Sequence, residues 1–189
     1  GMARLGNALR GLAITEQPPK LLLGWLNRLV YRQEAPEVTA SAVIGYLDPD
    51  TPRMTWSQAG HPPPVLVREG KGRLLPAPGG VILGAQPDGR YGQSTDPLEP
   101  GDLVVFYTDG LVERRGQDID EGITDLMRAA EQASHDDPHR AVDQLLAALG
   151  PTDADAESRE LRGSERVRDR AEPVVPGEAA AEPCLEATE

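Results

Sequence analysis

Hydrophobic residues recur every three or four positions near the N-terminus, which is typical of amphipathic helices. The spacing predicts one helix over Met2–Leu12 and a second helix that begins at Pro19 and continues to Arg32. Proline is favoured at the first helical position, because its missing N–H has no intrahelical partner there. The expected buried stripe of the second helix consists of Leu22, Trp25, Leu26, Leu29 and Val30. Trp25 is therefore expected in the core.

The hydrophobic period then shortens to two residues, and this alternation favours β-strands. The predicted strands are Val38–Leu47, Arg53–Ala59, Val65–Arg68, Arg73–Leu75, Gly92–Leu98 and Leu103–Tyr107. Short turn sequences separate most of them, including Gly70-Lys71-Gly72, and this spacing predicts a meander of antiparallel strands. The last strand is an unbroken apolar run, so we expect it to be buried on both faces.

Helical spacing returns beyond Gly116, first in a stripe from Ile123 to Ala130. Asp136-Asp137-Pro138 then supplies a cap and a first helical residue for a final helix that stops at Gly150. Beyond that point charged residues, Ala, Pro and Gly dominate, and such a segment buries too little apolar surface to offset its ordering entropy. The sequence therefore predicts one α+β domain over residues 1–150 and a disordered acidic, Pro- and Ala-rich tail over residues 151–189.

Composition narrows the possible partners of the 189-residue chain, whose formal net charge is −12. No basic cluster interleaves with aromatic residues, which argues against a nucleic-acid partner. Cys184 is the only cysteine, so there is neither a disulfide framework nor a cysteine-based zinc site. No apolar run reaches the length of a membrane span, and the N-terminus lacks the layout of a signal peptide. These features predict a cytoplasmic protein without a membrane partner.

Asp109 is the best candidate for a metal ligand, because it directly follows the predicted strand Leu103–Tyr107. Hard cations need oxygen ligands, and a carboxylate at the end of a rigid strand is well placed to provide one. The alternative is that Asp109-Gly110 forms an ordinary hairpin turn. From these residues alone both interpretations remain open.

Two other stretches invite a functional interpretation. His61 interrupts the predicted strand ladder, but a lone histidine in a turn is usually a hydrogen-bonding corner residue. The glycine-rich stretch from Pro78 to Gly84 lacks the spacing and the lysine of a P-loop, and no helix clearly follows it. A phosphate-cradling loop is therefore rejected.

Three motifs nevertheless follow one another in a familiar order. They are Ala59-Gly60-His61-Pro62-Pro63, the Gly79-Gly80 and Leu83-Gly84 turn, and Leu98-x-Pro-Gly-Asp102 followed by Tyr107-Thr-Asp-Gly-Leu-Val-Glu113. Together they resemble the sporulation stage II protein E type of metal-dependent protein phosphatase, the bacterial PPM phosphatases, over about Met2 to Gly150. The resemblance implies an α-β-β-α sandwich, in which two antiparallel sheets pack face to face and helices lie outside.

The resemblance also implies a function in sigma factor regulation. Phosphatases of this type use Mn²⁺ or Mg²⁺ and metal-activated water to hydrolyse phosphoserine or phosphothreonine on regulatory proteins, typically anti-anti-sigma factors. By the same resemblance, Asp109 matches a metal-binding acid and Asp102 matches a structural turn. His61 matches a motif whose role is structural or near the site.

The resemblance also implies metal-binding acids that this chain does not match. The family has an Asp pair before the helix that corresponds to Met2–Leu12, and a second Asp pair that opens a last core strand. Residues after Pro151 do not read as such a strand, so the sequence predicts a domain truncated at both ends, with exposed sheet edges and at most weak metal binding through Asp109. The alternatives are a non-catalytic phosphoprotein-binding module in sigma-factor partner switching and a fragment without a function of its own.

Overall fold

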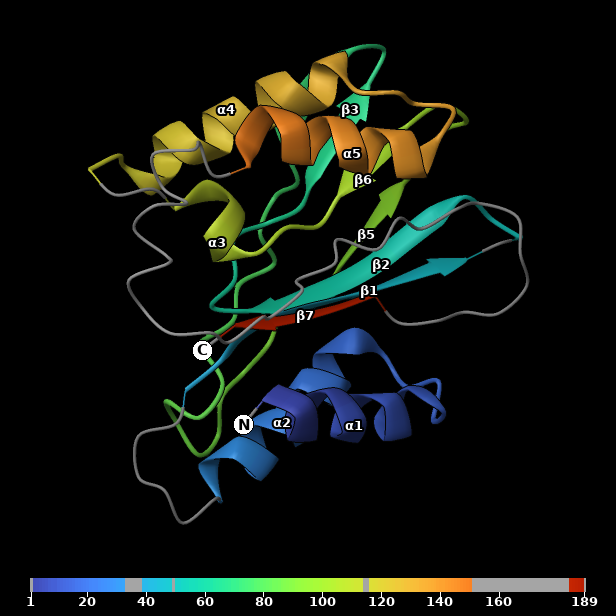
Figure 1. Cartoon of the computed structure of the whole chain (residues 1–189). Coiled ribbons are helices and arrows are strands. Elements are labelled where there is room, and N and C mark those ends of the chain that lie inside the picture. The colour runs from blue at the N-terminus through green and yellow to red at the C-terminus, as the bar shows by residue number, and fades with distance from the viewer. Residues whose placement is uncertain (1, 33–38, 49, 114–115, 151–183, 189) are drawn as a thin grey trace.

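Two antiparallel sheets pack face to face, and helices cover both outer sides (Figure 1). This arrangement was obtained as a computed structural model, which describes residues 2–32, 39–48, 50–113, 116–150 and 184–188. It has the α-β-β-α layers implied by the sequence motifs, so the predicted fold class is confirmed. Among the described residues, no helix combines the length and hydrophobicity that a membrane span requires.

The four-stranded sheet packs on the two N-terminal helices, α1 (Met2–Ala13) and α2 (Pro19–Tyr31). Its order is β5-β2-β1-β7, formed by Ser94–Pro97, Arg53–Ala59, Ser41–Asp48 and Cys184–Thr188. Buried leucines of the helices, such as Leu9 and Leu22, share one cluster with Ala42 and Ile44 of β1. The burial of this apolar surface holds the helical layer to the sheet.

The three-stranded sheet has the order β4-β3-β6, formed by Lys71–Leu74, Val65–Arg68 and Leu103–Val105. Helices α4 (Ile119–Gln132) and α5 (Pro138–Leu149) cover it, and the short helix α3 (Asp109–Val112) follows β6. Strand β4 begins two residues before its predicted start, because the preceding turn is made by Glu69 and Gly70, both with positive φ.

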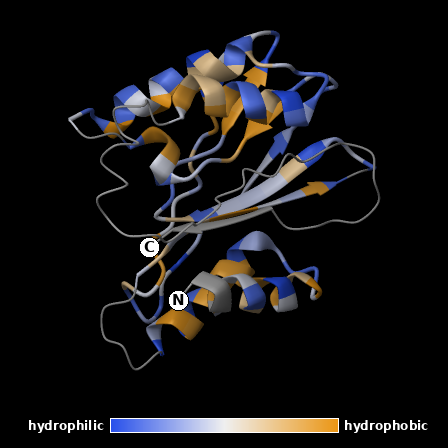
Figure 2. Cartoon of the chain, in the orientation of Figure 1, coloured by the Kyte–Doolittle hydropathy of each residue, from blue (hydrophilic) through white to orange (hydrophobic). Residues whose placement is uncertain are grey.

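Side-chain alternation divides the strand residues between separate clusters. Leu103 and Val105 of β6 pack with α4 and α5, whereas Val104 packs between the sheets. Figure 2 shows hydrophobic positions of the upper sheet beneath these helices. Both faces of the strand are packed, but only Val105 is fully buried, and the strand ends at Val105 and not at Tyr107.

One part of the predicted meander is wrong, because β2 and β3 belong to different sheets. The chain leaves β2 at Gly60, whose φ of 64° is left-handed and is readily adopted by glycine. Pro62, Pro63 and Pro64 follow, and proline cannot donate hydrogen bonds to a strand ladder. Residues 60–64 therefore carry the chain from one sheet to the other, and we call them the crossing loop.

Helix α2 is rotated relative to the predicted orientation. Its buried side chains include Leu22, Leu23, Leu26, Asn27 and Val30. Trp25 is 36% exposed and Leu29 is 42% exposed, so the prediction that Trp25 lies in the core is wrong. The cause is Asn27, whose amide donates to the Gln86 carbonyl at 2.8 Å and accepts from the Gly84 N–H at 2.8 Å. A helical pattern does not reveal a buried polar residue whose partners are distant in sequence.

The predicted disordered tail needs a correction at its end. Residues 151–183 and 189 lie outside the described residues, but Cys184–Thr188 forms β7 and pairs antiparallel with Ser41–Gly45 of β1. Without β7, β1 would present an edge of unpaired N–H and C=O groups. The pairing of β7 with β1 is made by backbone hydrogen bonds, which every residue other than proline can form. The composition of the tail therefore does not reveal this strand.

Candidate metal and phosphate site

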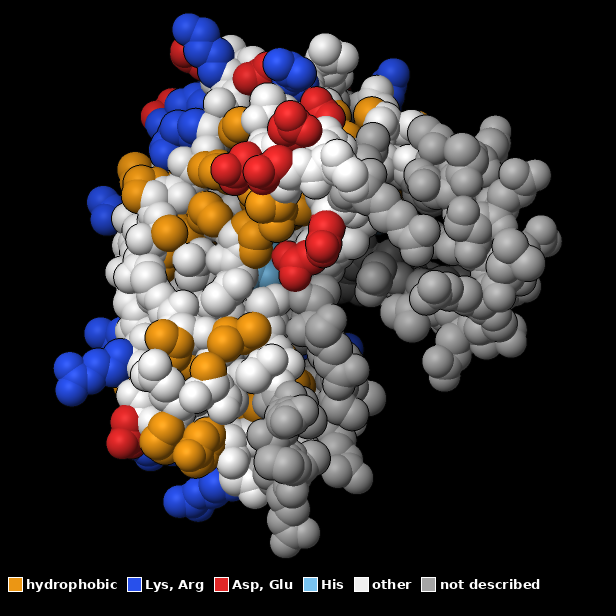
Figure 3. Space-filling model, turned by 90° about the vertical axis from the view of Figure 1, so that its left-hand side faces the viewer, with side chains coloured by type: hydrophobic (Ala, Val, Ile, Leu, Met, Phe, Trp, Pro, Cys, Tyr) orange, Lys and Arg blue, Asp and Glu red, His pale blue; other side chains and the backbone are white. Residues whose placement is uncertain are grey.

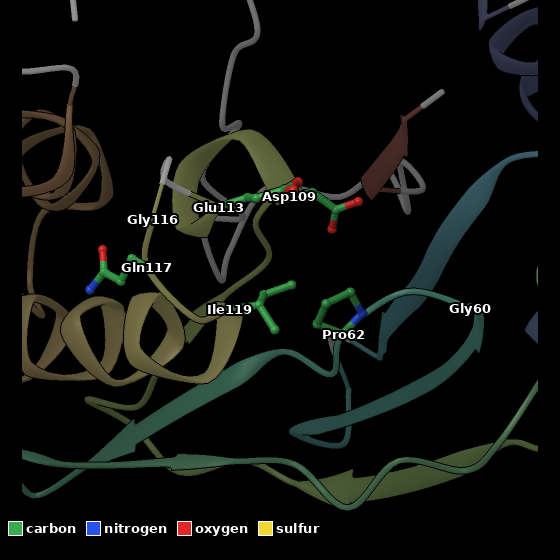
Figure 4. Close-up of a pocket in the computed structure, with 7 residues that line it drawn as sticks. All are labelled: Gly60, Pro62, Asp109, Glu113, Gly116, Gln117 and Ile119. Atoms are coloured by element: carbon green, nitrogen blue, oxygen red, sulfur yellow. The ribbon is translucent and has the colours of Figure 1, made fainter.

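A cavity of about 590 Å³ lies between α3, the start of α4 and the crossing loop (Figure 4). Its lining residues are Gly60, Pro62, Asp109, Glu113, Gly116, Gln117 and Ile119. The structure thus places Asp109, the predicted metal ligand, in the wall of a cavity. Asp109 at the start of α3 and Glu113 directly after its last residue lie on one side, and Pro62 lies across from them.

Helix α3 determines how the two carboxylates are presented. Asp109 is its first residue, so the alternative of an Asp-Gly hairpin turn is wrong. Within this turn the N–H of Leu111 donates to the Thr108 carbonyl at 3.0 Å, and the N–H of Glu113 donates to the Asp109 carbonyl at 2.7 Å. The second of these bonds keeps Glu113 close to Asp109 at the end of the turn, and both residues line the cavity.

The donor set of this cavity fits a hard cation, because its lining includes the carboxylates of Asp109 and Glu113. Figure 3 shows acidic side chains gathered in the upper half of one face, whereas Lys and Arg lie mainly at its edges. Within the described ranges, no group of three or more His, Cys, Asp and Glu side chains could share one metal ion. Mg²⁺ needs only one or two carboxylates when phosphate and water supply its other oxygens. Asp109 and Glu113 would meet that minimum.

His61 does not line the cavity, although both of its neighbours in the sequence do. It is 3% exposed, and its Nδ1 lies 2.7 Å from the Pro62 carbonyl. A carbonyl oxygen only accepts, so Nδ1 carries the proton in this contact. The ring meets that of Tyr107 edge-on, with centroids 6.2 Å apart. His61 is therefore a residue next to the site.

Tyr107 connects the crossing loop to the segment that carries Asp109. Its hydroxyl donates to the Pro63 carbonyl at 3.0 Å. Burial, and to a lesser extent the negative charge of Asp109, raises the pKa of this hydroxyl, so it stays protonated and able to donate.

Asp102 is a structural residue, as its turn motif predicted. Arg68 of β3 donates to both of its carboxylate oxygens, from Nε at 2.9 Å and from Nη2 at 2.6 Å. The backbone N–H of Glu99 donates to the same carboxylate at 2.8 Å. Burial alone would raise the pKa of Asp102, but these bonds and the positive charge of Arg68 hold it below its ordinary value.

We expect Asp102→Asn to lower the free energy of unfolding by about 2 kcal/mol at neutral pH, because a charge-assisted pair is lost. The folded-state pKa of Asp102 lies below that of the unfolded chain, which is about 3.9. The stabilisation is therefore complete well above this pH and is lost as the pH falls through the folded-state pKa. Urea unfolding at several pH values measures the difference between the variant and the unmodified protein.

The control is Glu99→Gln, which changes an exposed partner of the same Arg68. This variant should unfold within about 0.5 kcal/mol of the unmodified protein. Equal stability of Asp102→Asn and the unmodified protein at neutral pH would contradict the structural role of Asp102.

Glu113, Gln117 and Ile119 line the cavity but were not predicted from the sequence as site residues. Glu113 stands four residues after Asp109, which is a usable signal only once a helix is expected there. Gln117 and Ile119 lie at the start of α4, whose approach to α3 is a tertiary feature.

Two solved structures share this architecture. The structure of the RsbU and RsbW domains of Rv1364c from Mycobacterium tuberculosis matches with a TM-score of 0.67 and 27% identity, over 78% of this chain and 42% of that chain. The PP2C phosphatase domain of SpoIIE from Bacillus subtilis, with a fragment of its regulatory domain, matches with a TM-score of 0.64. The latter is 15% identical over 78% of this chain and 43% of that chain, and shows likeness of fold alone. The architecture is that of PP2C-type phosphatase domains.

The sequence identifies the family within that class. A sequence model of the stage II sporulation protein E (SpoIIE) family matches residues 1–161, and the chain belongs to this family. The resemblance found in the motifs is thus confirmed. Phosphoserine phosphatase RsbU of Bacillus subtilis (strain 168) is 26% identical over 132 residues, which is 69% of this chain and 39% of the relative. The chain therefore spans about two fifths of that relative's length.

Proposed function

We propose that this chain acts as a PPM-type phosphatase domain, with Asp109 binding Mn²⁺ or Mg²⁺ and a phosphorylated regulatory protein as substrate. The observation that carries the proposal is that two motifs, distant in sequence, meet in one cavity. Gly60 and Pro62 come from the first motif, and Asp109 and Glu113 from the third. The substrate would be phosphoserine or phosphothreonine on a protein of the anti-anti-sigma factor type, which agrees with a relative named as a phosphoserine phosphatase.

The chain itself would contribute two carboxylates and the cavity whose wall they form. Asp109 and Glu113 would hold the cation, and the hydrogen bonds of α3 restrain the backbone that carries them. When bound, Mn²⁺ or Mg²⁺ acidifies water and offsets the charge of the phosphoryl group. A cavity of about 590 Å³ is large enough to admit a phosphorylated side chain.

The second candidate is a non-catalytic module that binds a phosphorylated partner in sigma-factor partner switching. One observation favours this candidate. Among the described residues, no three His, Cys, Asp or Glu side chains are close enough to share a metal ion. Two carboxylates could retain a cation and its phosphate without assembling a two-metal centre.

Turnover of an aryl phosphate with Mn²⁺ distinguishes these candidates, with Asp109→Asn as the test variant and exposed Asp88→Asn as the control. For the enzyme we expect metal-dependent turnover that falls at least 10- to 100-fold in Asp109→Asn and is unchanged in Asp88→Asn. Absence of turnover together with Asp109-dependent binding of a phosphorylated anti-anti-sigma protein supports the module. Turnover and binding that are both indifferent to Asp109→Asn contradict the proposal.

A further inference from the structure

We propose that Tyr107 and His61 are positioning residues that fix the distance between two walls of the cavity, the crossing loop and the segment that leads into α3. With this distance fixed, Asp109 can hold a cation together with its phosphate. The inference rests on the proposed function for its ligand. Its structural part, the link between the two walls, concerns the protein alone and can be tested without metal.

The crossing loop contains three consecutive prolines, which limits the hydrogen bonds that its backbone can form. Pro62, Pro63 and Pro64 have no N–H groups, so hydrogen bonds to the backbone of this part of the loop can be made only at its carbonyl oxygens. Each of the three carbonyls accepts one hydrogen bond. The donors are Nδ1 of His61 to Pro62 at 2.7 Å, the hydroxyl of Tyr107 to Pro63 at 3.0 Å, and the N–H of Leu75 to Pro64 at 3.0 Å.

The two side-chain donors serve the part of the loop nearest the cavity. Pro62 itself lines the cavity, and Pro63 is its neighbour. Tyr107 stands two residues before Asp109, so its hydroxyl joins the loop wall to the segment that leads into α3. Only Thr108 separates Tyr107 from Asp109. A shift of Tyr107 would therefore also shift the backbone of Asp109.

His61 supports the same link from within the core. Its ring meets the ring of Tyr107 edge-on, at an interplanar angle of 62°, and so restricts the orientation of the tyrosine. Its Nε2 is buried without a hydrogen-bond partner among the described residues. A buried unpaired nitrogen costs stability, so packing alone does not account for a histidine at this position.

The first test is Mn²⁺ affinity, measured by calorimetric titration of Tyr107→Phe. Removing only the hydroxyl should weaken Mn²⁺ binding about tenfold, the lower range for loss of a group that orients a metal ligand. The matched control is Tyr46→Phe, which removes a buried hydroxyl without a partner in the described part of the chain. This control should bind Mn²⁺ like the unmodified protein.

A conservative rescue separates positioning by His61 from bulk packing. Asparagine can place an N–H donor near the position of the histidine Nδ1, whereas leucine cannot. We therefore expect His61→Asn to retain more of the Mn²⁺ affinity than His61→Leu. Equal losses in both variants would remove His61 from the proposal.

Hydrogen exchange in the metal-free protein supplies a second measurement. The amides of Leu111 and Glu113 close the turn of α3 and should exchange faster in Tyr107→Phe but not in Tyr46→Phe. Unchanged exchange and unchanged Mn²⁺ affinity in Tyr107→Phe would overturn the positioning role. The positioning role would also be overturned if Tyr107→Phe and Tyr46→Phe both weakened Mn²⁺ binding and protection from exchange in proportion to their loss of global stability. Faster exchange in a protein that binds no Mn²⁺ even when unmodified would keep the link and reject the proposed function.

Discussion

Trp56→Ala is expected to lower the free energy of unfolding by about 4 kcal/mol. Trp56 is 0% exposed and lies between the two sheets, where it packs in one cluster with Val43, Met54 and Leu66. Its removal takes a large apolar surface out of the core and leaves a cavity that the rigid sheets fill poorly. The indole N–H that donates to Asp96 at 2.8 Å is lost as well. Urea unfolding followed by circular dichroism measures the change.

The second tryptophan of the chain provides the matched control. Trp25 is 36% exposed on α2, so Trp25→Ala should cost less than about 1 kcal/mol. Trp56→Phe keeps most of the side-chain volume and gives a measurable loss if Trp56→Ala is unfolded in buffer. Losses of similar size in Trp56→Ala and Trp25→Ala would contradict the location of Trp56 between the sheets.

Gly122→Ala is expected to destabilise the protein by about 2 kcal/mol, although alanine is the better helix former. A Cβ atom at position 122 would lie 1.9 Å from the carbonyl oxygen of Val112 and 2.8 Å from its carbonyl carbon. Val112 is the last residue of α3, so either α3 or α4 must shift. Because Asp109 begins the same short helix, we also expect weaker Mn²⁺ binding, by about tenfold.

Gly24→Ala in α2 is the control for this substitution. A Cβ atom at that position meets nothing within 4 Å, so alanine should stabilise the protein by about 0.5–1 kcal/mol. The two glycine variants should thus change stability in opposite directions, and only Gly122→Ala should alter Mn²⁺ binding. Stabilisation by both would show that α4 does not approach α3 closely.

Local sequence signals predicted most of the helices and strands of this fold, though not α3 or β7. Helix α5 begins at Pro138, and the Asp137 side chain accepts from the Arg140 N–H at its start, as the capping pattern indicated. The edge position of β5 also follows from its sequence, because few of its residues are apolar. These features depend on neighbouring residues, which is why the sequence alone was sufficient.

The errors concern features that depend on distant partners. Asn27 is buried because of its bonds to Gly84 and Gln86, and this turned α2 away from the predicted stripe. The expected strand beyond Val105 instead leads into α3, which Gly122 approaches closely. The Asp109 part of the candidate site was therefore predictable from a motif. Glu113 belongs to the same motif, but its position beside Asp109 in the cavity became evident only from the structure.

The central claim is that Asp109 holds a divalent cation in the cavity between α3 and the crossing loop. Calorimetric titration of Mn²⁺ into the unmodified protein, Asp109→Asn and the exposed control Asp88→Asn tests it most directly. The account predicts binding that is 10- to 100-fold weaker in Asp109→Asn and unchanged in Asp88→Asn. Mn²⁺ binding of equal strength in Asp109→Asn and the unmodified protein would contradict it.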